Sequence, residues 1–278
     1  MALPDRFVKM SGGGNDFLLF EADGRRLSAE DRQRISLLCR RGLSVGADGA
    51  LFLSGGGEGR LHLDYFNADG GLADFCANGT RCAARYAVTR RLVAGDTVVL
   101  ETGFGPIPAR IEEDRVTLTL PALTPPGDPV AISGEGLPAT ATPMHVGVPH
   151  LVVIMDGEGD LSSLPVERLG PPLRRHPLMP HGANVNFVQV EGANHLAVRT
   201  YERGVEAETL ACGSGVVASA VTAARAGFVS PPVLCRTKSG VEFTVSLPEG
   251  DAPLSGVTLE GDAREIFTAE LSSEAWLE

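Results

Sequence analysis

The feature that most constrains this chain is an ordered repetition of three short motifs in its two halves. In the first half, an asparagine precedes an apolar run at 14–17, a polar turn follows at 66–70, and Cys76 precedes small residues that begin a helix. The second half repeats this order at 183–187, at 201–204 and at Cys212. One match can arise by chance, but three in the same order indicate an internal duplication. The sequence therefore predicts two similar domains that face one another across a cleft.

Apolar and β-branched patterns predict strands mixed with a few helices. Strands are expected at 17–20, 96–101, 116–120, 151–154, 186–190, 196–201, 241–246 and 257–260. A first helix is expected from Ser28, where Ser-Ala-Glu-Asp resembles a capping box, to just before Gly42. Two more are expected at 79–88 and at 213–226, the latter ended by Gly227. The seven prolines of Pro121–Pro149 predict a boundary region that no long regular element crosses.

Length, charge and hydropathy limit the classes of protein to consider. A chain of 278 residues favours two domains of roughly 100–150 residues each. The net charge of −11 disfavours nucleic acid as a partner, so an anionic substrate would be attracted locally, by arginines or helix N-termini. The apolar runs, such as Leu151–Met155, are too short to span a membrane, and the first residues lack the features of a secretory signal. We therefore expect a cytoplasmic protein with no membrane partner.

The residues available for cofactor chemistry are few. A pyridoxal phosphate enzyme needs a Schiff-base lysine, and the two lysines, Lys9 and Lys238, have no phosphate-binding context around them. The five cysteines are an odd number and none forms a Cys-x-x-Cys pair, which disfavours a disulfide framework. The six histidines do not cluster. The sequence predicts neither an organic cofactor nor a metal site.

The positions of Cys76 and Cys212 favour thiol chemistry. A helix N-terminus lowers the pKa of a thiol placed there, and small residues let a ligand approach the unpaired backbone N–H groups closely. Two such helix ends directed at one point would bind a carboxylate. One thiolate could then remove the α-proton of an amino acid while the opposite thiol delivers a proton to the other face. The product would have the inverted stereocentre, with the carbanion stabilised by fixed N–H dipoles.

Simpler interpretations remain open for each of these residues taken alone. Cys-Gly-Ser-Gly is more often only a helix start, and Asn15 can be a turn residue. Glu202 and Arg203 can form a solvated pair, and His150 can be a core histidine. The glycines at 12–14 are not followed by Gly-Lys-Ser/Thr, so a nucleotide loop is disfavoured. The remaining cysteines are interpreted as small buried apolar residues, namely Cys39, Cys82 and Cys235.

Five motifs together resemble those of the diaminopimelate epimerases. They are Gly-Gly-Asn-Asp-Phe at 13–17, Phe-Asn-Ala-Asp-Gly at 66–70, Cys-Ala-Asn-Gly-Thr-Arg-Cys at 76–82, Tyr-Glu-Arg-Gly at 201–204 and Ala-Cys-Gly-Ser-Gly at 211–215. The related proline racemases also pair two cysteines but lack the second and fourth of these motifs. The resemblance covers most of the chain.

The resemblance implies an α+β fold of two pseudo-symmetric domains, each a curved mixed β-sheet around a central helix, with the active site in the cleft between them. The first domain is expected at 1–122, completed by 264–278, and the second at 123–263. The implied activity is the cofactor-independent interconversion of LL- and meso-2,6-diaminopimelate, on the route to lysine and peptidoglycan. A homodimer is also implied, with Phe267 as a candidate interface residue.

The resemblance also implies roles for individual residues. Cys76 and Cys212 correspond to the two acid/base residues. The N–H groups that hold the reacting carboxylate correspond to Ala77, Asn78, Gly213 and Ser214. The contacts to the amino and distal groups of the substrate correspond to Asn15, Asn67, Asn184, Glu202 and Arg203. Two residues correspond to those that adjust the proton affinity of the thiols, His150 and Glu202.

The chain departs from the family pattern at several positions. Val148 stands where the family often has asparagine, Gly49 where it often has glutamine, and Ala77 where it has glycine. The segment after Tyr-Glu-Arg-Gly is one residue longer than a common version. These departures keep two alternatives open: a cofactor-independent racemase of another amino acid on the same fold, and a non-catalytic module that binds an amino acid.

Overall fold

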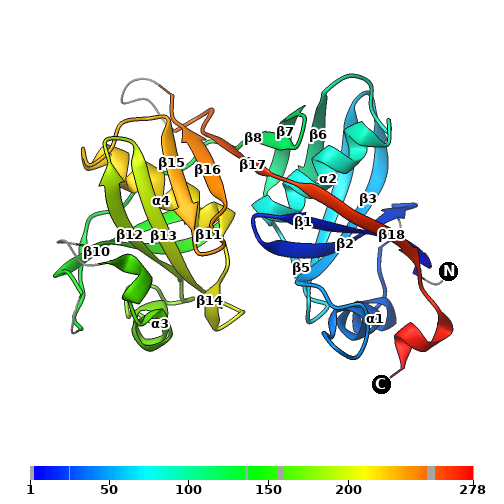
Figure 1. The fold of residues 1–278 in the computed structure, drawn as a ribbon, viewed down its shortest axis with the longest axis horizontal. Coiled ribbons are helices and arrows are strands. Elements are labelled where there is room, and N and C mark those ends of the chain that lie inside the picture. Colours follow the sequence, from blue (N-terminus) through cyan, green and yellow to red (C-terminus); the bar gives the residue numbers. More distant parts are fainter. Residues whose placement is uncertain (1–2, 25, 135–136, 156–159, 249–253, 278) are drawn as a thin grey trace. The chain divides into compact units, whose positions relative to one another are not determined.

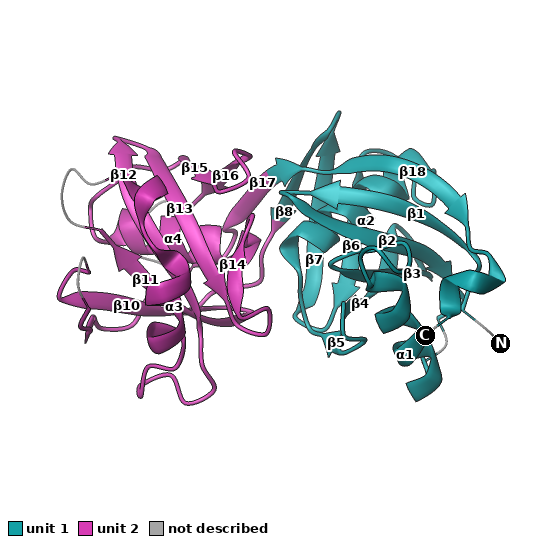
Figure 2. Ribbon diagram, turned by 60° about the horizontal axis from the view of Figure 1, so that its bottom comes forward, with its two compact units in different colours: residues 1–118, 261–278 teal, residues 119–260 magenta. Residues whose placement is uncertain are grey.

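The structure is a computed structural model that describes residues 3–24, 26–134, 137–155, 160–248 and 254–277. The chain divides into two compact units (Figure 2). Unit 1 contains residues 1–118 and 261–278, and unit 2 contains residues 119–260. Among the described residues, no helix is long and apolar enough to span a lipid bilayer.

Unit 1 is a mixed β-sheet with helices α1 (Ala29–Cys39) and α2 (Ala77–Thr89) and a 3-10 helix, η2 (Ser273–Trp276) (Figure 1). Its strands are β1 (Arg6–Gly12), β2 (Asn15–Ala22), β3 (Gly49–Gly57), β4 (Arg60–Asn67), β5 (Leu72–Ala73), β6 (Thr97–Thr102), β7 (Gly105–Glu112), β8 (Arg115–Thr119) and β18 (Arg264–Glu270). The sheet order is β18, β1, β2, β3, β4, β6, β7, β8. Pairs β2–β3 and β4–β6 are parallel, and the other pairs in this order are antiparallel.

Unit 2 is built in the same way, with α3 (Val166–Arg174), α4 (Gly213–Arg225) and the 3-10 helix η1 (Leu161–Ser163). Its strands are β9 (Val130–Ala131), β10 (Thr140–Val146), β11 (Val148–Ile154), β12 (Asn184–Gly192), β13 (His195–Glu202), β14 (Ala207–Thr209), β15 (Val233–Thr237), β16 (Glu242–Ser246) and β17 (Thr258–Asp262). The sheet order is β9, β10, β11, β12, β13, β15, β16, β17, and the parallel pairs are β11–β12 and β13–β15.

The two units therefore have one topology. Strands β1 to β8 of unit 1 correspond in order to β10 to β17 of unit 2, and each pair of neighbours has the same direction in both. Helix α1 corresponds to α3, because each joins the first parallel pair, and α2 corresponds to α4, because each joins the second. The prediction of an α+β chain with two pseudo-symmetric halves is confirmed.

The helices α2 and α4 are central to their units. Helix α2 contacts strands β1 to β4, β6, β7 and β18, and α4 contacts strands β10 to β13, β15 and β16. Both helices are buried along most of their length, which explains their content of small residues such as alanine. Each sheet curves around its central helix, since one helix could not otherwise contact so many strands.

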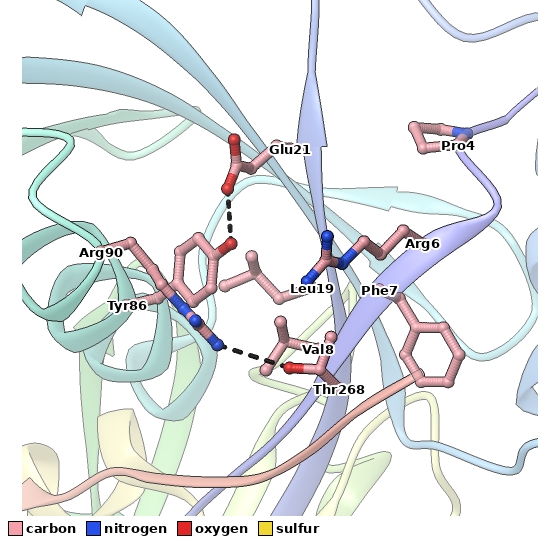
Figure 3. Close-up of a pocket in the computed structure, with 9 residues that line it drawn as sticks. All are labelled: Pro4, Arg6, Phe7, Val8, Leu19, Glu21, Tyr86, Arg90 and Thr268. Atoms are coloured by element: carbon pink, nitrogen blue, oxygen red, sulfur yellow. Dashed lines mark hydrogen bonds between the residues drawn. The ribbon is translucent and has the colours of Figure 1, made fainter. Parts of the chain in front are cut away.

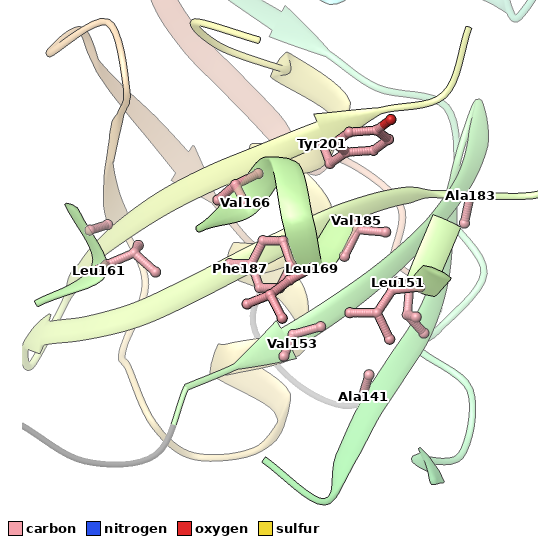
Figure 4. Close-up of a cluster of buried hydrophobic side chains, with 12 residues drawn as sticks. Ala141, Leu151, Val153, Leu161, Val166, Leu169, Ala183, Val185, Phe187 and Tyr201 are labelled. Carbon is pink, nitrogen blue, oxygen red and sulfur yellow. The ribbon is translucent and has the colours of Figure 1, made fainter. Parts of the chain in front are cut away.

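The outer helices cover the other face of each sheet. Figure 4 shows Val166 and Leu169 of α3 packed over side chains of β11, β12 and β13 in unit 2. Helix α1 packs in the same way on a cluster that includes Phe20, Phe52 and Phe66 in unit 1. These two clusters bury apolar side chains that would otherwise face water, which is the main stabilising contribution in each unit.

Most of the predicted elements are present, and the residues that end them act as expected. Ser28 caps α1 by accepting from the Asp31 N–H at 3.1 Å, and the Asp31 carboxylate accepts from the Ser28 N–H at 2.9 Å. This confirms the capping box. Gly227 follows α4 with a φ of 78°, a conformation that favours glycine.

The stretch 121–149 still contains a strand that the sequence did not predict, because β10 occupies Thr140–Val146 within it. Pro143 is accommodated because β10 pairs with β11 on one side, whereas β9 pairs only with Thr140 and Ala141 on the other. A proline that has no N–H to donate is tolerated where the ladder on one side is short.

Candidate active site

The two cysteines singled out by sequence occupy equivalent positions in the two units. Cys76 is the N-cap residue of α2 and Cys212 is the N-cap residue of α4, with extended backbone angles in both cases. Their carbonyl oxygens accept the first helical hydrogen bonds, from Thr80 at 2.8 Å and Val216 at 2.9 Å. Each thiol therefore lies at the positive end of a central helix, beside backbone N–H groups without a partner inside the helix.

The other three cysteines do not lie at helix N-termini: Cys39 ends α1, Cys82 lies within α2 and Cys235 lies in β15. Cys39, Cys82 and Cys235 are each at most 5% exposed. Burial raises the pKa of the Cys39 and Cys235 thiols to about 12 and raises that of Cys82 as well. They remain protonated at physiological pH and act as small apolar residues, as the sequence predicts.

In unit 1, a chain of hydrogen bonds orients two of the predicted site asparagines. Arg81, which is fully buried, donates to Asn78 Oδ1 at 2.6 Å, and Asn78 Nδ2 donates to Asn15 Oδ1 at 2.6 Å. Asn15 Nδ2 then donates to Asp48 at 2.8 Å. A guanidinium can only donate and a carboxylate can only accept, so the two ends of the chain determine the orientation of both amides.

Charged residues hold the end of this chain in place. Asp48 also accepts from Arg41 at 2.7 Å, and Arg41 forms a second ion pair with Asp16. Asp16 is paired as well with Lys9, a residue only 8% exposed whose ammonium also donates to the Gly46 carbonyl. The loop before β3 is thus bound to the start of β2, which fixes Asn15 relative to α2.

In unit 2, a comparable set of hydrogen bonds orients His150. Thr200 Oγ1 donates to Asn186 Oδ1 at 3.0 Å, which fixes the orientation of the Asn186 amide. Asn186 Nδ2 therefore donates to His150 Nδ1 at 3.1 Å. The imidazole proton is therefore on Nε2, which is buried and has no hydrogen-bond partner among the described residues. Burial, with contributions from His145 and Arg203, lowers the pKa of His150 to about 3, so the ring is neutral.

The residues around Cys212 are also mutually connected. Asn184 Oδ1 accepts from the Arg203 N–H at 2.8 Å, and Asn184 Nδ2 lies 4.0 Å from Cys212 Sγ. Ser214 Oγ lies 3.5 Å from the same sulfur. Gly215 packs so tightly against the Asn186 amide that an added Cβ would overlap it. Unit 2 therefore brings Asn184, Arg203, Cys212 and Ser214 into one cluster.

The remaining predicted site residues lie at strand ends and helix starts. Asn67 ends β4 and Glu202 ends β13, and the carbonyl of each accepts a turn hydrogen bond at 2.9 Å and 2.8 Å respectively. Ala77 and Gly213 are the first residues of α2 and α4, and both are buried. Each of these four residues thus has a counterpart in the other unit.

Sequence reasoning assigned no role to several residues that build these clusters, namely Asp48, Arg81, Asn186 and Thr200. Arg81 lies within the quoted motif at 76–82, three residues after Asn78. Residues at this spacing share one face of a helix, and this spacing was the available signal. Asn186 and Thr200 lie in predicted strands, and only the strand register of the structure reveals that they are paired.

A surface pocket of about 330 Å³ lies elsewhere in unit 1 (Figure 3). The Tyr86 hydroxyl at its side donates to Glu21 at 2.5 Å, and Arg90 is paired with Glu265 at 2.6 Å. Tyr86 and Arg90 are thus already bonded to acidic side chains of the protein, and none of the predicted site residues lines the pocket. Among the described residues, no group of three or more His, Cys, Asp or Glu side chains is arranged to hold a metal ion.

Comparison with known proteins gives a consistent result. A family model described as diaminopimelate epimerase matches residues 7–121 and 143–262. The diaminopimelate epimerase of Methanothrix thermoacetophila is 39% identical over 250 residues, 84% of this chain and 86% of that protein. That of Aquifex aeolicus is 36% identical over 281 residues, 96% of this chain and 98% of that protein.

Two solved structures share the fold at low sequence identity. A hydroxyproline epimerase from Agrobacterium vitis, with bound trans-4-hydroxy-L-proline, has a TM-score of 0.69 at 16% identity and covers 98% of this chain and 92% of that chain. A phenazine biosynthesis protein of the PhzF family from Bacillus anthracis has a TM-score of 0.70 at 16% identity, with coverage of 96% and 98%. These likenesses concern the fold alone.

Proposed function

Because the chain belongs to the diaminopimelate epimerase family, as its motifs predict, we propose that it interconverts LL- and meso-2,6-diaminopimelate by proton transfer to and from Cys76 and Cys212. The observation that carries the proposal is that each cysteine caps the central helix of one of two units with the same topology. In this proposal each unit acts as one epimerase domain and supplies one of the two cysteines.

The reaction exchanges one C–H bond for another. One cysteine, as thiolate, takes the α-proton, which breaks the Cα–H bond and forms an S–H bond. The other cysteine, as thiol, gives its proton to the opposite face of the carbanion and becomes the thiolate. The carbanion is stabilised by the reacting carboxylate, which accepts from the N–H groups of Ala77, Asn78, Gly213 and Ser214.

The second amino-acid centre of diaminopimelate selects which end reacts. Side chains from both units are assigned to the amino and distal groups, namely Asn15, Asn67, Asn184, Glu202 and Arg203. An arginine and several amides suit a carboxylate next to an ammonium, because together they offer donors and acceptors. His150, which is neutral, and Glu202 adjust the proton affinity of the thiols.

Two observations support chemistry that uses only side chains of the protein. Both lysines are already engaged, Lys9 with Asp16 at 2.7 Å and Lys238 with Glu208 at 2.7 Å, which disfavours a Schiff base to a cofactor. The five cysteines are free thiols. This suits a reducing cytoplasm, where the product would serve lysine and peptidoglycan synthesis.

We assign a homodimer to the enzyme on the basis of strand β18. Ile266 and Phe267 on this strand are 53% and 45% exposed, and exposed apolar side chains of this size favour an interface. Analytical ultracentrifugation of the purified chain tests the assignment.

The function is tested by incubating the purified protein with LL-diaminopimelate in deuterated water. We expect deuterium at one α-carbon and formation of the meso isomer. A protein that leaves diaminopimelate unlabelled but labels another amino acid from a panel would be a racemase on the same fold. A protein that binds diaminopimelate without any exchange would be a binding module.

A further inference from the structure

Gly49, at the start of β3, lies where a side chain has no room. An added Cβ would overlap the Phe66 carbonyl oxygen and lie 2.7 Å from Cε2 and 3.2 Å from the hydroxyl oxygen of Tyr65. In the β3–β4 ladder, Tyr65 is paired with Leu51, two residues after Gly49. Its ring must therefore lean along the strand toward Gly49, the first residue of β3. The Tyr65 hydroxyl therefore occupies the space that a side chain at position 49 would fill.

This space faces the predicted active-site residues of unit 1. Gly49 pairs with Phe17 and with Asn67, and residues that are paired, or two apart on one strand, share a face of the sheet. Asn15, Asn67 and Tyr65 therefore share one face. The Tyr65 ring packs edge-on against Phe17 with centroids 6.0 Å apart.

The start of α2 covers this same face. An added Cβ on Gly79, in the first turn of α2, would lie 2.9 Å from Leu51 and 3.5 Å from Phe17. The face thus carries the helix start that Cys76 caps. Asp48, the neighbour of Gly49, accepts from Asn15. Tyr65 therefore shares a face of the sheet with Asn15 and Asn67, which are assigned to the substrate.

The pseudo-symmetry of the fold shows what Gly49 lacks. Phe17 pairs with Gly49 in unit 1 as His150 pairs with Asn184 in unit 2, so Asn184 is the counterpart of Gly49. Asn184 is assigned to the substrate and lies beside Cys212. Unit 1 has no side chain at this position, and Tyr65 brings a polar group to the place.

We propose that Tyr65 is a specificity-determining residue whose hydroxyl donates a hydrogen bond to the distal carboxylate of the substrate. The inference rests on the proposed function, which assigns the reacting carboxylate to the helix starts and leaves the distal one for the strand ends. A phenol is a donor suited to a carboxylate, and a hydrogen bond to a charged group is stronger than one between neutral groups. Of the two groups at the distal centre, only the carboxylate can accept the hydroxyl proton.

The test compares Tyr65→Phe with Tyr86→Phe, which removes a hydroxyl from the same unit outside the site. Tyr65→Phe is expected to raise KM for LL-diaminopimelate about tenfold with kcat changed less than about twofold, because the lost contact stabilises bound substrate and transition state equally. Tyr86→Phe is expected to leave both constants unchanged. L-Lysine, which lacks the distal carboxylate, is expected to inhibit the wild type and Tyr65→Phe with the same inhibition constant.

Several results would overturn the proposal. A KM for Tyr65→Phe within twofold of the wild type would show that the hydroxyl does not contact the substrate. An equal loss of affinity for L-lysine would place the contact elsewhere on the ligand, and a fall in kcat alone would indicate a structural role. In contrast, failure of the proposed function itself would appear as absence of α-proton exchange in the wild type.

Discussion

The two units share a backbone but surround the starts of their central helices with side chains of opposite character. The equivalent pairs, taken from the strand registers, are Phe17 and His150, Leu51 and Asn186, and Tyr65 and Thr200. In unit 1 these side chains are aromatic or aliphatic, whereas in unit 2 they are polar and bonded to one another. The duplication has therefore preserved topology and the position of the cysteine, while the chemistry around each thiol has diverged.

The difference shows two ways to position a helix start. Under α2, apolar contacts support the helix and the amides are oriented by Arg81 from within the helix itself. Under α4, the supporting residues are themselves polar, so each donor and acceptor must be matched. Unmatched buried polar groups are costly, which makes the second arrangement more sensitive to small changes.

The most severe test of the comparison removes the thiol that both units carry at the start of the central helix. Cys76→Ala and Cys212→Ala are each expected to lower kcat by about 10³-fold or more, because each removes a group that transfers a proton in the transition state. Circular dichroism should show intact folds, since both residues are small and lie at helix starts. If only one of the two variants loses activity, the cysteines do not act as a pair.

The next largest effect compares the two hydrogen bonds that orient asparagine side chains, from Arg81 to Asn78 in unit 1 and from Thr200 to Asn186 in unit 2. Arg81→Met leaves Asn78 Oδ1 without its buried donor and is expected to lower the free energy of unfolding by about 3 kcal/mol. Thr200→Val removes the corresponding donor to Asn186 at nearly constant volume, with an expected loss of about 1 kcal/mol. Urea unfolding of both variants measures the difference. Equal losses would mean that the guanidinium is not the stronger constraint.

A pair of glycines gives a smaller and more local contrast. An added methyl group at Gly215 would overlap the Asn186 amide, whereas at Gly79 it would meet the flexible end of Leu51 at 2.9 Å. Gly215→Ala is expected to destabilise by about 2 kcal/mol. Gly79→Ala is expected to stay within about 1 kcal/mol of the wild type, because the better helix propensity of alanine offsets the contact. Thermal unfolding checks the order, and a reversed order would contradict the contrast between the two surroundings.

The last contrast is a dependence on pH that belongs to unit 2. Burial lowers the pKa of His150 to about 3, so between pH 6.5 and pH 3 the unfolded chain binds a proton that the folded chain does not. Stability therefore falls as the pH drops through this range. His150→Gln should reduce the loss between pH 7 and pH 4.5 by about 2 kcal/mol.

Urea unfolding of the wild type and His150→Gln at the two pH values measures this difference. Phe17→Leu, at the equivalent position of unit 1, is the matched control and should leave the pH dependence unchanged. A pH dependence that is the same in the wild type and His150→Gln would show that the imidazole is accessible to water.

The local signals in the sequence sufficed for the elements that carry the chemistry. The capping box at Ser28, the glycine after α4 and the small residues that follow Cys76 and Cys212 act within a few residues along the chain. Their conformational preferences therefore hold whatever the rest of the fold does. The ordered repetition of motifs was equally readable, because it needs no knowledge of contacts, and it predicted the two pseudo-symmetric halves. Its matches of 66–70 with 201–204 and of Cys76 with Cys212 join structural counterparts. The match of 14–17 with 183–187 is wrong, because β2 corresponds to β11, and β12 corresponds to β3.

Long-range packing decided the elements that the sequence did not predict. Helix α3 contains Pro171 and Pro172, which disfavour a helix locally, yet it forms because Leu169 and Leu173 are buried against β11 and β12. Strand β10 forms around Pro143 in the same way, through its pairing with β11.

The sequence alone determined which residues can do chemistry. It also determined that they occur twice in one order. Only the tertiary structure decided how they are oriented, by placing Asn78 against Asn15 and Tyr65 over Gly49. The physical reason is that these contacts join residues through helix faces and strand registers, and their free energy is realised only when the whole unit has folded.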